Sequence, residues 1–253
     1  MNLIEANSND HQKFSRYEFK YILSNLNADL IENEIKTFMY PDIFSKKNKD
    51  LSYPVRSLYF ENDLNECFHE KNDGLKSRVK FRIRTYSFKE SEINSSNVFF
   101  ELKGKYNERT YKNRIKIKNL NNLELFNNYN KIFELCKLYK NDEIIQKFVH
   151  QSFRKKIRPK VIIDYIRKPY ISDFDSNFRI TFDKNLRASP MRSLTFKRKK
   201  FEEVLSGYTI IEIKFNRRIP MWFHRIIQVN QLKKKSVSKF VEGLKTLKLA
   251  IEI

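Results

Sequence analysis

Four cationic residues alternate along one short segment of the chain. Residues 76–86 read KSRVKFRIRTY, so that Arg78, Lys80, Arg82 and Arg84 occupy every second position. In a β-strand such positions share one face, and the apolar residues between them point the other way. Like charges so close repel one another, and a polyanion lying along the strand would turn this repulsion into binding energy. The guanidinium groups of Arg82 and Arg84 suit phosphate oxygens in particular, because they present planar forks of donors and stay charged.

The same alternation recurs in other segments that we predict to be strands. The expected strands cover residues 13–23, 53–61, 76–88, 97–106, 109–118, 160–170, 178–183 and 207–215. Arg or Lys repeats on the face opposite the apolar one, and four acids are the expected partners: Glu18, Glu101, Asp183 and Glu212. A sheet curled around such a face would form a charged tunnel. We therefore expect an α+β fold in which about eight antiparallel strands form a barrel, with helices packed outside.

Helical periodicity fills the remaining segments. The expected helices cover residues 27–39, 121–139, 142–155, 220–229 and 236–249, with a short helical piece near 64–70. The chain has 253 residues with only 4 Gly and 6 Pro, which argues against long flexible linkers. We expect one domain over residues 1–253, with a helical insert at about 121–155.

The formal net charge of +21 predicts an anionic partner. Nucleic acid is less favoured than a narrow phosphate chain, because aromatic residues such as Phe81 and Tyr111 point toward the core side of the strands and not toward the cations.

Cys67 and Cys136 are too few and too far apart for a disulfide scaffold or a zinc site. No apolar stretch reaches the roughly 18 residues that a membrane span needs. With no signal-peptide pattern at its start, the chain is expected to be soluble and cytoplasmic.

Two acid–base pairs at spacing i, i+2 could bind a metal ion. Glu101 precedes Lys103 in this way, and Glu212 precedes Lys214. Each pair could form a simple same-face salt bridge, or its glutamate could hold Mg²⁺ or Mn²⁺ while phosphates supply further ligands.

The sequence contains no P-loop, kinase glycine loop, nucleophile elbow or Rossmann fingerprint. Any nucleotide would therefore be bound by cationic side chains rather than by a glycine-rich loop.

Seven motifs occur in one order between about residue 13 and residue 245. They are RYEFKY at 16–21, VRSLYF at 55–60, RIRTY at 82–86, FELK at 100–103, FRITFD at 178–183, IEIK at 211–214 and SVSKFVEG at 236–243. On these motifs the chain resembles the VTC-type polyphosphate polymerase domain, in the CYTH or triphosphate tunnel metalloenzyme superfamily. One departure is Arg16, where the wider superfamily has the first of two paired glutamates, and it favours the VTC-type branch over triphosphatases and adenylate cyclases.

The resemblance implies an eight-stranded antiparallel barrel whose tunnel binds ATP and inorganic polyphosphate. It implies catalytic roles for five residues: Arg82, Arg84, Lys103, Arg179 and Lys214. It implies phosphate binding by Lys20 and by Lys239, which would close one end of the tunnel. Weaker phosphate-binding candidates are Arg56, Lys80, Lys116, Ser238 and Tyr59. Glu212 would be the metal carboxylate, with Mn²⁺ or Mg²⁺ as cofactor.

The expected activity is metal-dependent transfer of the ATP γ-phosphate onto a growing polyphosphate chain. Two alternatives use the same tunnel: a tri- or polyphosphatase in which water is the acceptor, and a non-catalytic module that binds polyphosphate or inositol polyphosphates. The sequence lacks the phosphate-sensing and membrane-spanning segments of yeast relatives. We therefore expect release of product in the cytoplasm unless a separate membrane partner exists, and we expect no nucleic-acid partner.

Overall fold

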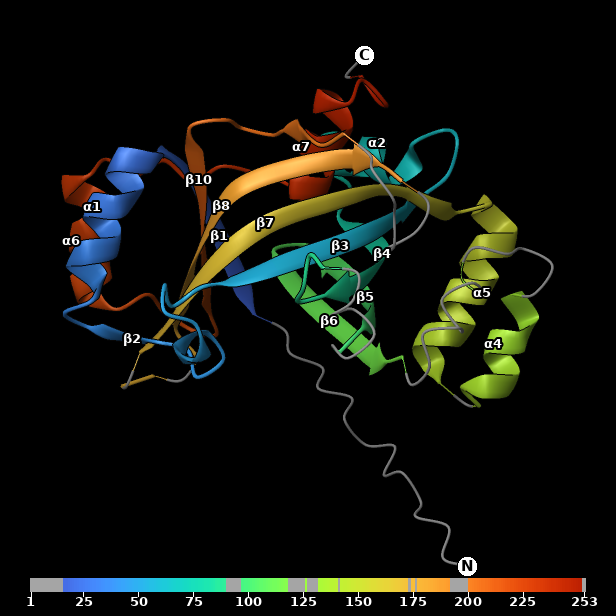
Figure 1. The fold of residues 1–253 in the computed structure, drawn as a ribbon, viewed down its shortest axis with the longest axis horizontal. Coiled ribbons are helices and arrows are strands. Elements are labelled where there is room, and N and C mark those ends of the chain that lie inside the picture. The colour runs from blue at the N-terminus through green and yellow to red at the C-terminus, as the bar shows by residue number, and fades with distance from the viewer. Residues whose placement is uncertain are drawn as a thin grey trace, which may run out of the picture.

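One antiparallel sheet forms the centre of the protein in the computed structural model (Figure 1). The structure describes residues 16–89, 97–117, 126, 132–140, 142–172, 174–175, 177–191 and 200–251. Its strands are β1 (Tyr17–Ser24), β2 (Met39–Pro41), β3 (Tyr53–Glu61), β4 (Ser77–Thr85), β5 (Phe99–Tyr106), β6 (Arg109–Lys116), β7 (Arg158–Ser172), β8 (Arg179–Pro190), β9 (Glu202–Glu203) and β10 (Tyr208–Phe215). They are ordered β1-β10-β8-β7-β3-β4-β5-β6, and β2 and β9 pair with β7 and β8 outside this path.

The sheet curls until its two end strands approach each other. Arg16, just before β1, exchanges backbone hydrogen bonds of 3.3 and 3.2 Å with Thr110 of β6. In the described part of the chain this is an isolated bridge, and no ladder follows it along β1 and β6. The antiparallel α+β architecture is thus confirmed, but the expected closed barrel of eight strands is not: the sheet has ten strands and remains open at this seam.

Helices cover the sheet in three groups, and each group has its own apolar cluster. The helices are α1 (Asn25–Ile35), α2 (Glu66–Asn72), α4 (Ile132–Leu138), α5 (Glu143–Lys155), α6 (Met221–Val229) and α7 (Lys239–Thr246), with a 3₁₀ turn η1 (Ser45–Lys47). Helices α4 and α5 pack on β3–β6 at one end of the molecule, and α1 and α6 pack on β1, β10 and β8 at the other (Figure 1). None of the helices in the described ranges is long and apolar enough to cross a bilayer.

The third group packs on the opposite face of the sheet from the other two. Phe240 of α7 lies 5.1 Å from the ring of Tyr59, and both belong to a buried cluster with Phe68 of α2 and Ile163 of β7. We call the face of the sheet that carries Tyr59, Lys20 and Glu212 the charged face, and α7 and α2 cover one end of it. The apolar cluster under α7 and α2 therefore borders the charged face at one end, and the seam between β1 and β6 runs along the same sheet.

The helix boundaries differ from the expected ones where tertiary contacts intervene. The first helix was expected to reach residue 39, but it ends at Ile35, because Met39–Pro41 pairs with Tyr170–Ser172 of β7 as strand β2. The last helix begins at Lys239, three residues later than expected. Helix α5 begins as the sequence predicts, since the Asp142 carboxylate accepts hydrogen bonds from the next turn at 2.9 and 3.2 Å. Most of the expected helix 121–139 lies outside the described residues; its described part includes α4.

Substitution of Phe148 tests the cluster under α5. Phe148 is fully buried and its ring lies 4.8 Å from Phe100 and 5.1 Å from Phe60. We expect Phe148→Ala to lower the free energy of unfolding by about 3–5 kcal/mol, measured by denaturant titration, because a cavity remains among the aromatic rings. Phe153→Ala on the same helix is the matched control, since Phe153 is 40% exposed and should cost less. Equal losses in the two variants would contradict this description of the core.

Candidate functional site

Three cations surround one buried carboxylate on the charged face. Arg82 pairs with Glu101 across β4 and β5, and Glu101 pairs with Arg114 of β6. Nε and Nη2 of Arg82 both lie 2.7 Å from Oε2 of Glu101, Nε of Arg84 lies 3.9 Å from it, and Lys112 forms an ion pair with Oε1. Burial alone would raise the pKa of Glu101, but Arg82, Arg84 and Lys112 hold it well below its usual range. Glu101 is therefore a permanent anion.

Hydroxyl groups fix the two arginines of β4. Nη1 of Arg82 donates to the Tyr59 hydroxyl at 3.0 Å, while Arg84 donates to Ser57 Oγ at 3.0 Å and to the Tyr165 hydroxyl at 3.2 Å. Burial alone would raise the pKa of Tyr59, but the charges of Arg82 and Arg84 lower it to about 8. Each guanidinium is thus held in one orientation before any ligand arrives.

A second group of charges lies between β7, β8, β10 and α7. Arg167 donates to both oxygens of Asp183 at 2.6 Å and to Glu212 at 3.1 Å. Nζ of Lys239, at the first turn of α7, lies 2.6 Å from Asp183 and 2.6 Å from Glu212. Burial alone would raise the pKa of Glu212, but Lys239 and the surrounding cations hold it well below its ordinary value. These contacts join the last helix to the centre of the sheet.

Lysines of β1, β5 and β10 connect the two groups. Nζ of Lys20 lies 3.2 Å from Glu18 and 3.6 Å from Glu212, and Nζ of Lys103 lies 3.2 Å from both oxygens of Glu18. Nζ of Lys214 lies 3.4 Å from Glu212. The ion pair between Glu18 of β1 and Lys103 of β5 therefore spans the seam between β1 and β6, where the backbone forms no continuous ladder.

Together these side chains form what we call the charge cluster: Glu18, Lys20, Arg82, Arg84, Glu101, Lys103, Lys112, Arg167, Asp183, Glu212, Lys214 and Lys239. The cluster contains eight cationic side chains against four carboxylates, so its net charge is positive. Most of these groups are withdrawn from water, which strengthens every charge interaction inside. Such a surface can bind an anion with several charged oxygens.

The structure brings most of the expected site residues together. Lys20, Arg82, Arg84, Lys103, Lys214 and Lys239 belong to the charge cluster with Glu212, and Tyr59 touches it. Lys80 shares the face, with its Nζ 4.4 Å from the centre of the Phe240 ring. Burial lowers the pKa of Lys80 to about 8, despite Cys67 and Glu61 nearby. Ser238 occupies the N-cap position of α7, but its side chain makes no capping hydrogen bond.

Three expected cations lie outside the charge cluster. Arg56 faces the opposite side of the sheet, where its Nε and Nη2 donate to the carboxylate of Asp164 at 2.9 and 2.8 Å. Arg56 stands two residues before Leu58 in β3 and therefore lies on the same apolar face of the sheet. Arg179 forms an ion pair with Asp42 at the end of the charged face, and Lys116 is exposed at the end of β6.

Two cations of the charge cluster, Arg167 and Lys112, were not among the expected site residues. Arg167 was expected to share a face with Tyr165, but no role was assigned to it. Lys112 belongs to the same alternating series as Arg114 and Lys116, two positions earlier. Burial and the charges of Arg82 and Arg84 lower the pKa of Lys112 to about 7, although Glu101 opposes the shift. Continuing the alternation along each strand would have identified both residues.

A divalent metal ion fits this site only if a ligand completes its coordination. Within the described ranges no three His, Cys, Asp or Glu side chains form a metal-binding group. Glu212 and Glu18 do offer carboxylate oxygens on the same face, and Lys20 lies between them. Mg²⁺ and Mn²⁺ accept one or two protein carboxylates when phosphates and water provide the rest. The donor set thus fits such an ion together with a phosphate ligand.

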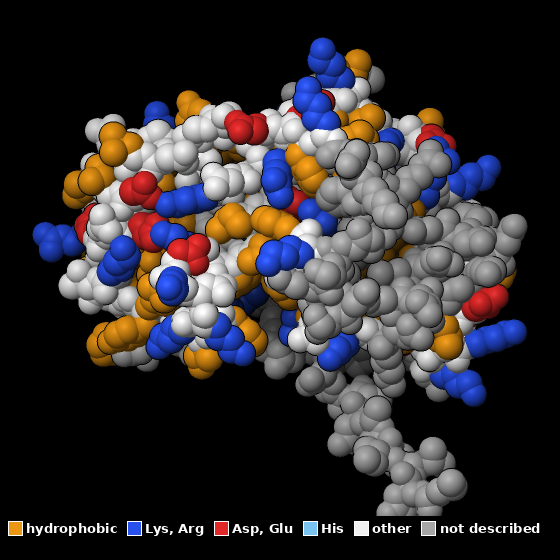
Figure 2. Space-filling model, in the orientation of Figure 1, with side chains coloured by type: hydrophobic (Ala, Val, Ile, Leu, Met, Phe, Trp, Pro, Cys, Tyr) orange, Lys and Arg blue, Asp and Glu red, His pale blue; other side chains and the backbone are white. Residues whose placement is uncertain are grey.

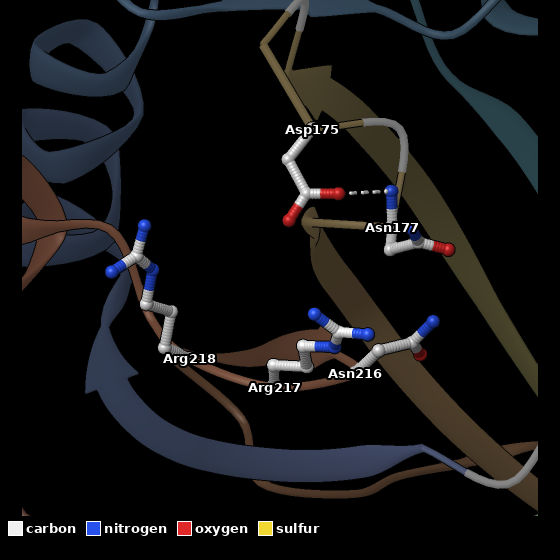
Figure 3. A pocket seen from close by; sticks show the side chains of 5 residues that line it. All are labelled: Asp175, Asn177, Asn216, Arg217 and Arg218. Atoms are coloured by element: carbon white, nitrogen blue, oxygen red, sulfur yellow. Dashed lines mark hydrogen bonds between the residues drawn. The ribbon is translucent and has the colours of Figure 1, made fainter.

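A hollow opens at the end of the sheet where Lys214 of β10 pairs with Arg179 of β8. It has a volume of about 600 Å³, and its lining residues are Asp175, Asn177, Asn216, Arg217 and Arg218. Figure 3 shows Arg218 at the left of the space and Arg217 below it, with Asp175 and Asn177 above. Asn216 follows Lys214 by two residues, and Asn177 precedes Arg179 by two residues, so both lie at the same end of this antiparallel pair. We call this space the outer hollow, and it extends the row of charges toward solvent.

Comparisons with known proteins address the fold. None of the curated proteins compared with the sequence matches it significantly. A candidate adenylate cyclase from Bacillus halodurans has a similar structure, with a TM-score of 0.51, 13% identity, and coverage of 89% of this chain and 95% of that one. A candidate adenylyl cyclase from Hippeastrum with a dominant triphosphatase activity has a TM-score of 0.50 and 11% identity, with coverage of 89% and 93%. At these identities the likeness concerns the fold alone.

The sequence itself carries the family assignment. The family model described as the VTC domain matches residues 15–248, from the start of the described sheet to just beyond α7. This range includes every member of the charge cluster. The chain therefore belongs to the VTC domain family.

Proposed function

We propose that this protein is a phosphotransferase that moves the γ-phosphoryl group of ATP onto the end of an inorganic polyphosphate chain. The excess of cations in the charge cluster carries this proposal. Four carboxylates stabilise the buried cations without neutralising them, so a linear polyphosphate would gain charge-assisted hydrogen bonds from groups that are already oriented. The family of the chain and the tunnel-like curl of its sheet support the same substrate class.

The chemistry requires positioning and charge stabilisation rather than a protein nucleophile. A terminal oxygen of the polyphosphate chain is already anionic near neutral pH and would attack the γ-phosphorus of ATP in line. A new P–O bond forms, the bond between the γ-phosphorus and the bridging oxygen breaks, and ADP leaves with that electron pair. No general base is needed, because no proton must be removed from the attacking oxygen.

Different residues of the charge cluster would bind the transferring phosphoryl group, the neighbouring phosphates and the metal ion. Arg82 and Arg84, held by Glu101, Tyr59 and Ser57, would bind the equatorial oxygens of the transferring group. Lys103 and Lys20 would hold the neighbouring phosphates. Glu212 would hold Mn²⁺ or Mg²⁺, which when bound would offset negative charge on the phosphate oxygens.

A triphosphatase that uses water as the acceptor is the second candidate. The outer hollow favours it, since this solvent-filled space lies beside the last residues of β10 and the first residues of β8, where water would be available as an acceptor. The structural neighbour from Hippeastrum has a dominant triphosphatase activity, but its identity of 11% is too low to carry that activity over to this chain. Both candidates use the same cations, so only the products distinguish them.

Incubation with ATP and Mn²⁺, followed by gel electrophoresis of the products, tests the proposal. We expect a ladder of polyphosphate together with ADP. Orthophosphate without a ladder would overturn the transferase in favour of hydrolysis. Absence of turnover, combined with tight polyphosphate binding, would identify a binding module.

In the same assay Arg82→Ala should lower kcat about 10²–10³-fold, because one preorganised donor to the transferring group is lost. Arg82→Lys should recover only part of the rate, since an ammonium group cannot form the fork. Arg225→Ala, exposed on α6, is the matched control and should leave the rate unchanged. Thermal unfolding of each variant separates lost catalysis from lost folding, which matters because Arg82→Ala leaves Glu101 with fewer partners. A full rate in folded Arg82→Ala would refute the role of this arginine.

Tyr59 offers a spectroscopic test of where phosphate binds. Burial opposes ionisation of Tyr59, but Arg82 and Arg84 lower its pKa to about 8, whereas the pKa of Tyr165 is raised. As pH rises, tyrosinate absorbance should therefore increase near pH 8, and Tyr59→Phe should remove this step. Bound tripolyphosphate would offset the charge of the two arginines, so the step should move to higher pH. A step that saturating tripolyphosphate leaves in place would show that the phosphates lie elsewhere.

The outer hollow should select for longer chains. We expect the double variant Arg217→Ala/Arg218→Ala to weaken binding of long polyphosphate several-fold, with a smaller dependence on salt. Binding of tripolyphosphate should change little, since three phosphates can be held within the charge cluster. Titration calorimetry at two ionic strengths measures both affinities, and Arg109→Ala, exposed at the start of β6, is the control. Equal weakening for short and long chains would contradict this role.

A further inference from the structure

A short segment beside β2 exposes large apolar side chains. Ile43 is 74% exposed, Phe44 is 72% exposed, and Tyr40 of β2 is 51% exposed. Ile43 and Phe44 are neighbours on the chain, and the 3₁₀ turn η1 follows directly. Large apolar side chains that are exposed together are uncommon on a soluble domain and mark interaction surfaces.

Exposed lysines follow these apolar residues. Lys46 and Lys47 lie in η1 and Lys49 lies two residues further, and all three are exposed. Of the two acids nearby, Asp42 is buried and forms an ion pair with Arg179, while the exposed Asp50 accepts a hydrogen bond from Ser52. In Figure 2 hydrophobic and basic side chains interleave at the lower left corner, where Figure 1 shows β2 and the turn after it.

Hydrogen bonds hold this segment in place. Ser45 is fully buried and its hydroxyl donates to the Asp42 carbonyl at 2.7 Å, and the Phe44 amide donates to the Asp42 carboxylate at 3.0 Å. Strand β2 itself pairs with β7. The exposure of Ile43 and Phe44 thus belongs to a locally fixed backbone within the described residues.

We propose that the segment formed by Tyr40, Ile43, Phe44, Lys46, Lys47 and Lys49 docks on the surface of an anionic lipid bilayer. The apolar side chains would enter the boundary between headgroups and acyl chains, and the lysines would meet the lipid phosphates. A bilayer suits this surface better than a folded protein does, because the segment offers six side chains, whereas a stable protein interface uses roughly 20–30 residues on each partner.

Docking would also orient the site. Because Asp42 pairs with Arg179, the segment adjoins the outer end of the charged face. The bilayer would therefore lie near that end of the molecule, with the helices α4 and α5 at the other end (Figure 1). The docking itself does not depend on the proposed transferase activity.

Cosedimentation of the full chain with lipid vesicles tests the proposal. We expect binding to phosphatidylcholine vesicles that contain phosphatidylserine, and weak binding to phosphatidylcholine alone. The double variant Ile43→Ser/Phe44→Ser keeps every charge, and should lower the partition coefficient at least about tenfold through the lost apolar contacts. Lys46→Glu/Lys47→Glu should abolish the preference for anionic vesicles.

The matched control is Leu26→Ser/Leu30→Ser on α1, where the two leucines are 72% and 60% exposed and the lysines nearby, Lys168 and Lys184, form ion pairs with acids of the same helix. It should bind vesicles like the parent protein. Turnover of ATP in solution should be unchanged in Ile43→Ser/Phe44→Ser, which shows that the fold and the site survive. Absence of vesicle binding by the parent protein would overturn the proposal. Undiminished binding of Ile43→Ser/Phe44→Ser would do so as well, since diffuse attraction by the net charge of +21 would then suffice.

Discussion

Burial of an excess of positive charge on one face of a sheet is the constraint on which the rest of this structure depends. Cations withdrawn from water destabilise a fold unless carboxylates or hydroxyls accept their hydrogen bonds. Glu101 and Glu212 each contact several cations, so a few acids stabilise many bases. With one acid for each base the face would be stable but neutral, and it would have no affinity for an anion. The shared carboxylates allow both stability and affinity.

This arrangement requires that the first turn of α7 lies against the charged face, and one glycine permits it. A Cβ atom at Gly243 of α7 would lie 2.3 Å from Cδ1 of Ile163 and 3.2 Å from Cβ of Ala188. The absence of a side chain therefore lets α7 approach β7 and β8 closely. Lys239, at the start of the same helix, can then reach Asp183 and Glu212 together. Apolar packing of α7 and the position of its lysine are thus consequences of one close contact.

The sequence predicts the parts of this design that follow from alternation along a strand. The strand around Arg82 and Arg84, the role of Glu101 as their partner and the covering helices could all be anticipated in this way. Arg56 lies outside the charge cluster, because its position two residues before Leu58 places it on the apolar face, and this alternation can be read from the sequence. Strand β2 and the open seam could not be predicted, since both depend on which distant strands meet. The seam is closed in part by Lys103 and Glu18, a contact between residues 85 positions apart.

The choice between arginine and lysine at each position has a consequence for anion binding. Arg82, Arg84 and Arg167 keep their charge at any relevant pH, so they provide a constant field. Burial lowers the pKa of Lys80 to about 8 and that of Lys112, beside Arg82 and Arg84, to about 7. These two lysines therefore lose charge as pH rises through this range, while a bound polyanion would raise their pKa and draw protons onto them. On the proposed function, anion binding at the charged face would consequently be coupled to proton uptake, and the arginines would set the part of the affinity that pH does not change.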